Sequence, residues 1–186
     1  MARKKPKYEA SLGPSKSINL QLNDILMELD KEIKNLKKAN AKGLVHAAYH
    51  IRRETESVYP ATPVDLGNLR ASWFTVSSYG GIEPDPLGLS GTFKNRIGKK
   101  MQFKASELKA QHKAIVGAAQ AEARSKRGEP LVIFGYTANY ALYVHEGIGF
   151  EFTERTPPAG YQWLQRAMER NKKEIVKIVE HFSQIP

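Results

Sequence analysis

Thr62-Pro63-Val64-Asp65-Leu66-Gly67-Asn68-Leu69-Arg70-Ala71-Ser72-Trp73 is the stretch that decides the fold, because it ends one helix and begins one strand. Pro60 and Pro63 cannot continue a helix, and each favours extended geometry in the residue before it. The Asp65 carboxylate can accept hydrogen bonds from nearby backbone N–H groups, and Gly67 supplies the positive φ that a turn needs. These residues predict a tight turn directly after a helix.

The residues after the turn alternate in the manner of a strand. Leu69, Ala71 and Trp73 fall on one face of an extended segment, with Arg70 and Ser72 on the other. The aromatic and β-branched run that follows also favours extended structure. We therefore expect a strand from Leu69 to Tyr79. Local physics alone makes the whole stretch a helix-to-strand corner of an α+β domain.

Apolar residues at helical spacing lie on both sides of this corner. Upstream they predict a helix from Ile18 to Val58, either bent near Gly43 or continuous. Downstream they predict a C-terminal helix from Tyr161 to Phe182. Leu131–Tyr136 is short and apolar, which predicts a central strand. The fold class we expect is α+β, with a small, mainly antiparallel sheet packed by these two helices; whether the intervening insertion adds strands stays open.

The chain is predicted to form a single domain, residues 17–186, behind a flexible basic arm, residues 1–16. A basic insertion at about residues 81–129 separates the two strands. Within it, residues 103–126 predict a helix with Ser106 as N-cap. The helix has a thin apolar stripe, so we expect it to serve contacts between subunits more than the core. Deletion of residues 92–128 is accordingly expected to leave a folded subunit.

Positive charge is concentrated in the arm and the insertion. The formal net charge is +10, of which residues 1–17 hold +4 and residues 92–128 hold +8, so the remainder sums to −2. This distribution favours contact with acidic protein surfaces or with nucleic acid. The side chains expected to make partner or nucleic-acid contacts are Lys94, Arg96, Lys99, Lys100, Lys104, Arg124, Lys126 and Arg127.

The sequence offers few candidates for catalysis or metal binding. It has no cysteine, which excludes disulfides and zinc–thiolate sites, and no apolar run approaches the roughly 20 residues of a membrane-spanning helix. His46 and His50 are four residues apart on a predicted helix, but no third metal ligand is evident. His145 and Glu146 could suggest acid–base chemistry. A helical turn over Tyr140–Glu146, beside an aromatic cluster of Tyr136, Tyr140 and Tyr143, accounts for them better. We expect no enzyme, no cofactor and no metal.

Three blocks follow one another in the sequence: the opening stretch, then Asn139-Tyr140-Ala141-Leu142-Tyr143-Val144-His145-Glu146-Gly147, then Pro158-Ala159-Gly160-Tyr161-Gln162-Trp163-Leu164-Gln165-Arg166-Ala167-Met168. In this order they resemble the neck, or tail-completion, proteins of long-tailed bacteriophages, with Leu66 where that family usually has threonine. The motif residues are Pro63, Asp65, Gly67, Leu69, Arg70, Ser72, Tyr140, Ala141, Tyr143, Glu146 and Gly147.

The resemblance implies a virion structural protein in the neck, made in the host cytoplasm. It implies a homo-oligomeric ring of six copies, or alternatively twelve, at the head–tail interface. Such a ring joins the connector or stopper to the tail-terminator or tail-tube proteins and leaves a bore for DNA, which it contacts at most without sequence preference. The alternative function is a basic nucleic-acid-binding protein that uses residues 92–128.

Arg70 is the residue expected to tie the first two blocks together. A partly buried guanidinium needs carboxylate partners, and its fork geometry suits them better than a lysine would. We therefore predict that Arg70 pairs with Asp65 or with Glu146.

Overall fold

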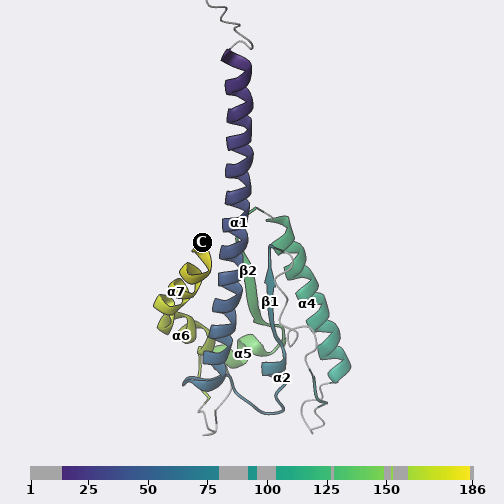
Figure 1. Cartoon of the computed structure of the whole chain (residues 1–186). Helices are drawn as coiled ribbons and strands as arrows, with labels where there is room; N and C mark the ends of the chain where they lie inside the picture. The colour runs from purple at the N-terminus through teal and green to yellow at the C-terminus, as the bar shows by residue number, and fades with distance from the viewer. Residues whose placement is uncertain are drawn as a thin grey trace, which may run out of the picture. The chain divides into compact units, whose positions relative to one another are not determined.

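The computed structural model describes residues 14–79, 92–95, 104–126, 128–148, 152 and 159–184, with side chains from residue 23 onward. The chain forms two compact units, Met1–Asn35 and Leu36–Pro186. Of the predicted arm, residues 1–13 lie outside the described residues. The second unit holds both strands and every helix that covers them (Figure 1).

Helix α1, Pro14–Ser57, is a single helix of 44 residues that begins before the predicted start at Ile18. It is uninterrupted at Gly43, so the helix does not break there. The glycine has a packing role instead, because an added Cβ would lie 2.9 Å from the Cα of Val179. Gly43 therefore lets the C-terminal part of the chain approach α1 closely.

The sheet has two strands among the described residues, and they confirm the predicted α+β class. Strand β1, Trp73–Ser77, pairs antiparallel with β2, Val132–Tyr136, and Thr75 lies opposite Phe134. The strand predicted at Leu131–Tyr136 is confirmed. Its predicted central position is not, because within the described chain β2 pairs only with β1.

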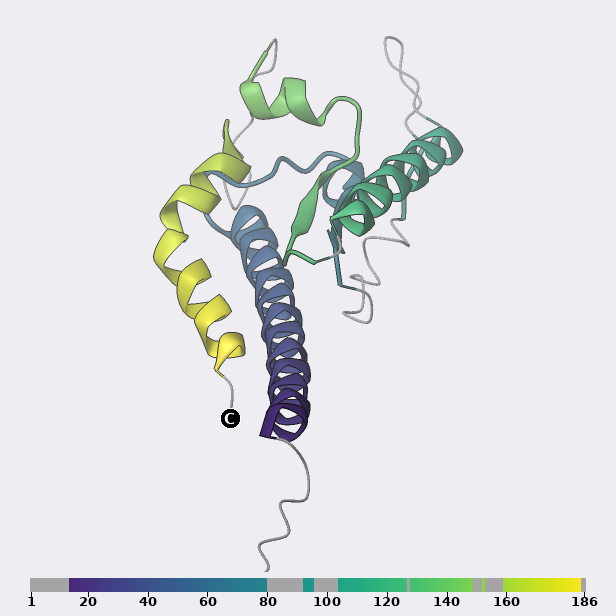
Figure 2. The ribbon, with the colours of Figure 1, turned by 90° about the horizontal axis from the view of Figure 1, so that it is seen from above.

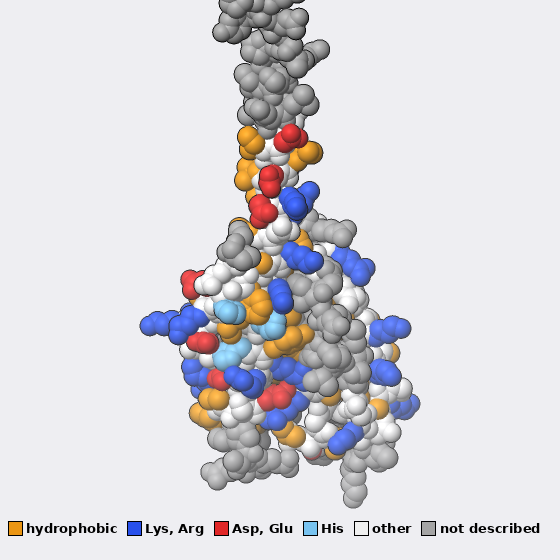
Figure 3. All heavy atoms as spheres, in the orientation of Figure 1, with side chains coloured by type: hydrophobic (Ala, Val, Ile, Leu, Met, Phe, Trp, Pro, Cys, Tyr) orange, Lys and Arg blue, Asp and Glu red, His pale blue; other side chains and the backbone are white. Residues whose placement is uncertain are grey.

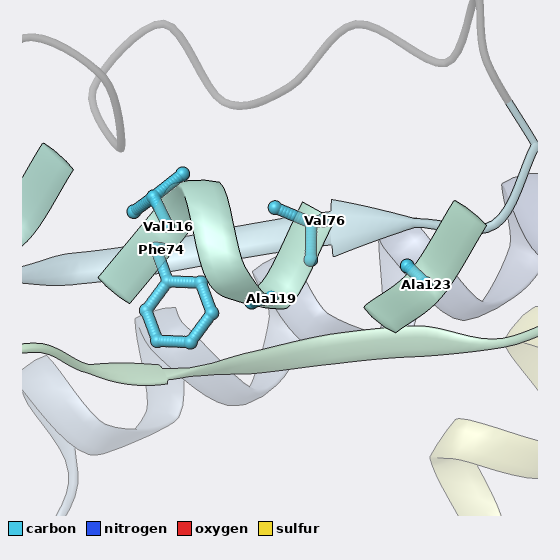
Figure 4. Close-up of a cluster of buried hydrophobic side chains, with 5 residues drawn as sticks. All are labelled: Phe74, Val76, Val116, Ala119 and Ala123. Carbon is cyan, nitrogen blue, oxygen red and sulfur yellow. The ribbon is translucent and has the colours of Figure 1, made fainter. Parts of the chain in front are cut away.

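β1 is buried along almost its whole length because both of its faces are covered. Phe74 and Val76 pack against Val116 and its neighbours on helix α4, Ala105–Ser125 (Figure 4). Trp73 points the other way and packs with Ile51 of α1. Figure 2 shows the same arrangement, with α4 and α1 on opposite sides of the strands. Alternation along β1 thus serves two apolar layers rather than one.

Helix α4 contributes more to the core than its sequence predicted. Its five buried residues are Leu108, His112, Val116, Ala119 and Ala123, whereas Ile115 is exposed. Removing residues 92–128 would uncover Phe74 and Val76, which argues against the expected folded deletion mutant. Ser106 is not the N-cap either. The helix begins after Lys104, and the Ala105 N–H donates to Asn95 Oδ1 at 2.8 Å.

The C-terminal region forms two helices, not the single predicted one. Helix α6, Trp163–Arg170, and helix α7, Lys172–Ser183, are separated at Asn171. The Asn171 side chain donates to the Ala167 carbonyl at 2.9 Å and lies 3.1 Å from His50 Nε2 on α1. Both helices run beside α1 (Figures 1 and 2). The short helix expected near residue 140 is confirmed as α5, Ala141–Glu146.

Candidate functional site

The corner that begins the fold contains a helical turn that the sequence did not predict. Helix α2, Asn68–Ala71, follows Gly67, whose φ of 84° confirms the predicted need for glycine. The Ser72 hydroxyl donates to the Leu69 carbonyl at 2.7 Å and closes the turn. The strand therefore starts at Trp73, and the predicted alternation from Leu69 was wrong. A helical turn buries Leu69 while the backbone changes direction.

Arg70 holds this corner to the end of α1. Its guanidinium donates to the Glu56 carbonyl at 3.2 Å and to the Thr62 carbonyl at 3.1 Å. The Glu56 carbonyl lies in the last turn of α1, where carbonyls lack intrahelical donors and attract cations, which explains this partner. The prediction of Asp65 or Glu146 as the partner was wrong, because the Arg70 donors go to main-chain carbonyls and Glu146 pairs with His145.

The three sequence blocks meet in one buried cluster, which we call the block junction. Leu69 comes from the first block, Val144 from the second and Trp163 from the third, and Ala138 completes the cluster. Trp163 is almost fully buried. Blocks that lie far apart in the chain therefore share one core, and the sequence had not assigned Trp163 or Val144 to it.

Two glycines mark the places where the blocks touch. At Gly147, an added Cβ would lie 2.3 Å from the ring of Tyr161, and the φ of 73° also favours glycine. At Gly160, an added Cβ would lie 2.6 Å from the Cβ of Pro60. The second block thus presses on the third, and the third on Pro60, two residues before the first block begins. Backbone groups reinforce the contact, because the Gln162 N–H donates to the His145 carbonyl at 2.8 Å.

His145 lies at the edge of the block junction. Its ring meets the Trp163 ring edge-on, with the centroids 4.7 Å apart. Its Nδ1 lies 2.8 Å from Glu146 Oε1, while His145 Nε2 and Trp163 Nε1 are buried without a hydrogen-bond partner among the described residues. The arrangement orients the imidazole and packs it against an aromatic ring. Tyr136 and Tyr140 pack against the junction as predicted. Tyr143 is exposed, so its predicted place in the aromatic cluster was wrong.

Tyr136 fastens the junction to the end of α1. Its hydroxyl lies 3.0 Å from Thr55 Oγ1 and 2.9 Å from Thr62 Oγ1. Burial raises the pKa of Tyr136 above its ordinary value of 10.0, and the two threonine hydrogen bonds oppose that shift. Tyr136 therefore stays neutral and links three separate segments through one buried hydroxyl.

Large apolar side chains are exposed around the block junction, and we call them the apolar rim. The rim consists of Tyr59, Leu142, Tyr143, Ile148 and Tyr161. Tyr161 contacts the Gly147 position and Tyr59 lies beside Gly160, while Leu142 and Tyr143 lie on α5 beside Val144 of the junction. Clustered exposed apolar side chains are typical of protein–protein contact sites. Sequence patterns did not reveal the rim, because tertiary packing decides which apolar residues stay uncovered.

The predicted contact residues of the insertion divide into two groups. Lys94, Lys104, Arg124 and Lys126 are exposed, as a contact role requires. The other four, Arg96, Lys99, Lys100 and Arg127, lie outside the described residues. Asn68 fixes the backbone at residue 94, because its amide donates to the Lys94 carbonyl and accepts from the Lys94 N–H. The corner and the insertion are therefore physically connected.

His46 and His50 have protein partners rather than the geometry of a metal site. The His46 ring stacks on Phe182 with the centroids 4.4 Å apart, and His50 lies beside Asn171. Across the part of the chain that the structure describes, no three His, Asp or Glu side chains are grouped to hold a metal ion. Over the same residues, no helix combines the length and apolarity that crossing a membrane requires. Comparisons with protein-family models, with curated proteins and with solved structures gave no match.

Proposed function

We propose that this protein is a virion structural component of the neck of a long-tailed bacteriophage, where copies form a ring between head and tail. One observation carries the proposal: the three blocks that resemble the neck family meet in the block junction, beneath the apolar rim. The motif residues thus have a common structural task. Gly67, Leu69 and Ser72 shape the corner, and Gly147 admits Tyr161.

The block junction suits assembly rather than turnover of a substrate. Trp163, Leu69 and Val144 fill the space between the blocks, and His145 is held by Glu146 and packed on Trp163. Rigid apolar packing of this kind fixes the shape of the surface above it. A subunit of a ring needs surfaces of fixed shape, because every pair of successive copies must join in the same geometry.

In this proposal, six copies, or alternatively twelve, surround a bore that DNA can pass. The ring contacts the connector or stopper on one side and tail proteins on the other. The exposed lysines of the insertion face acidic protein surfaces, because many phosphate contacts would hold DNA through counterion release and resist its passage.

One observation favours a second function. The exposed cations Lys104, Lys109, Lys113, Arg124 and Lys126 all lie on or beside α4. A basic helix of this kind could bind duplex DNA without sequence preference. That function would show as tight duplex binding by the isolated protein, with affinity falling steeply as salt rises.

The experiment that tests the ring is electron microscopy of the purified protein and of particles that carry it. We expect rings of one fixed copy number, and density for this chain between head and tail. Tyr143→Asp in the apolar rim should abolish head–tail joining. Val176→Asp is a matched control, since Val176 is exposed to a similar extent on α7, outside the rim. Three results contradict the proposal: a purified protein that stays monomeric, particles without density for this chain between head and tail, or tight DNA binding by the isolated protein.

A further inference from the structure

The first unit exposes a row of large apolar side chains along α1. Ile25 is 62 % exposed, Leu26 57 %, Leu29 54 % and Ile33 41 %. At 3.6 residues per turn, these four fall within an arc of about 100° on one side of the helix. We call them the α1 stripe. Met27, 66 % exposed, lies on the opposite side. Helices gain most of their stability in water from burying such a stripe, so the α1 stripe needs a covering surface.

The same segment is acidic in an otherwise basic chain. Between residues 23 and 32, four carboxylates face one lysine, a net charge of −3, whereas the whole chain carries +10. Figure 3 shows hydrophobic and acidic side chains together on this part of α1. Glu28 and Glu32 flank one edge of the α1 stripe. The surface that covers the stripe is therefore expected to be basic along the matching edge.

Helix α4 of the second unit presents such a surface. Its buried residues, among them Leu108 and Val116, lie on one side, so the opposite side faces outward. Ala110, Ala114 and Ala121 occupy that outward side and are exposed. The exposed cations Lys109, Lys113 and Arg124 flank one edge of it. The small side chains beside these cations leave room for the large side chains of another helix.

We propose that the α1 stripe of one copy docks on the outward face of α4 in a second copy. The two helices run antiparallel, because only that direction brings the acidic edge of the stripe against the basic edge of α4. We place the two helices in the register that brings Leu29 near Ala118 and Glu32 near Lys113. Antiparallel pairing of two α1 stripes fits less well, since it would bring Glu28 and Glu32 against the same residues of the other copy.

The contact joins two different surfaces of the same chain, so each copy can bind one neighbour through α1 and another through α4. Contacts of this head-to-tail type generate closed rings when the rotation between copies closes. The inference deepens the proposed ring and rests on it, because it names which surfaces join successive copies.

The natural absence of cysteine permits a direct test by crosslinking. Full-length Leu29→Cys and Ala118→Cys proteins are mixed and oxidised, so that a product of twice the mass can form only between copies. We expect the mixed disulfide to dominate over either self-linked product. Lys173→Cys, exposed on α7, replaces Ala118→Cys as the control and should not link. Three outcomes overturn the contact: self-linked Leu29→Cys as the main product, preferred linkage to Leu142→Cys in the apolar rim, or no linkage.

Two pairs of substitutions test the same contact without cysteine. Leu29→Glu should weaken association at least about tenfold, whereas Met27→Glu, on the opposite side of α1, should leave it unchanged. Glu32→Lys and Lys113→Glu should each weaken association, and the double variant should recover it. Equal effects of Leu29→Glu and Met27→Glu, or no recovery in the double variant, overturn the contact. Rings that persist in microscopy without the α1–α4 linkage would refute this contact alone, whereas the absence of rings would refute the proposed function as well.

Discussion

Two parts of α1 share one apolar periodicity but differ in burial. In residues 23–35 every side chain is exposed, including Ile25 and Leu29. Between residues 41 and 51, Ala41, Val45 and Ile51 are almost completely buried. The comparison teaches that periodicity predicts a helix and its apolar side, whereas the rest of the fold decides whether that side is covered.

Residue size helps to explain why the later part is covered. Ala41, Ala47 and Ala48 keep the helix surface shallow, so neighbouring elements approach closely. At its end, Ile51 meets Trp73 of β1 and Ala167 of α6. The earlier part carries longer apolar side chains between acidic ones, which is typical of a surface that meets a partner rather than its own core.

The largest expected effect compares two isoleucines of the same helix. Ile51→Ala should lower the free energy of unfolding by about 2–5 kcal/mol, because Ile51 is 1 % exposed and the substitution leaves a cavity. Ile33→Ala, at 41 % exposure, should change it by less than about 0.5 kcal/mol in dilute protein. Urea unfolding at low concentration measures both. Equal losses would abolish the distinction between the two parts of α1.

The second largest effect is expected from removing the Tyr136 hydroxyl, which connects β2 to the end of α1. Tyr136→Phe leaves the buried Thr62 hydroxyl without its partner and should cost about 1–3 kcal/mol. The matched control is Tyr143→Phe, whose hydroxyl is on an exposed side chain and should contribute almost nothing. Thermal unfolding of the two variants gives the comparison, and a Tyr136→Phe protein as stable as the wild type would show that the network contributes no net stability.

A smaller effect concerns Gly43, near the start of the buried part. Gly43→Ala gains helix propensity but forces a Cβ to within 2.9 Å of the Val179 Cα, so the net loss should be about 1–2 kcal/mol. Gly117→Ala on α4 meets nothing within 4 Å and should stabilise by about 0.5–1 kcal/mol. Opposite signs in calorimetry would confirm that α7 packs closely on α1. Stabilisation by both substitutions would disprove it.

The smallest effect is the pH dependence contributed by His46. Partial burial and the neighbouring Lys42 lower the pKa of His46 below its ordinary value of 6.5, so the folded state prefers the neutral ring. Its contribution to stability is present above pH 6.5 and is lost as the pH falls from 6.5 through the lowered folded pKa. Unfolding midpoints measured across this window should fall less in His46→Gln than in the wild type. If the unfolding midpoint depends on pH in the same way in both proteins, His46 has the same pKa in the folded and the unfolded state.

Much of the fold follows from local sequence. The spacing of apolar residues predicted α1 and a helical C-terminal region, although as one helix rather than two, and the run Leu131–Tyr136 predicted β2. Gly67 was recognised as the turn glycine, because positive φ is a local property of the backbone. The basic character of the insertion was equally visible, since charge needs no fold to be counted.

Only the tertiary structure decided which of these features meet. Arg70 bonds to the Glu56 and Thr62 carbonyls, at and just beyond the end of α1, rather than to a carboxylate. Gly147 is required partly because Tyr161 lies against it. The burial of α4 against Phe74 and the exposure of the α1 stripe likewise have no local signature. Sequence periodicity fixes the side of a helix or strand on which a side chain lies. The free energy that the side chain contributes depends on what the folded chain packs against that side, which is a non-local property.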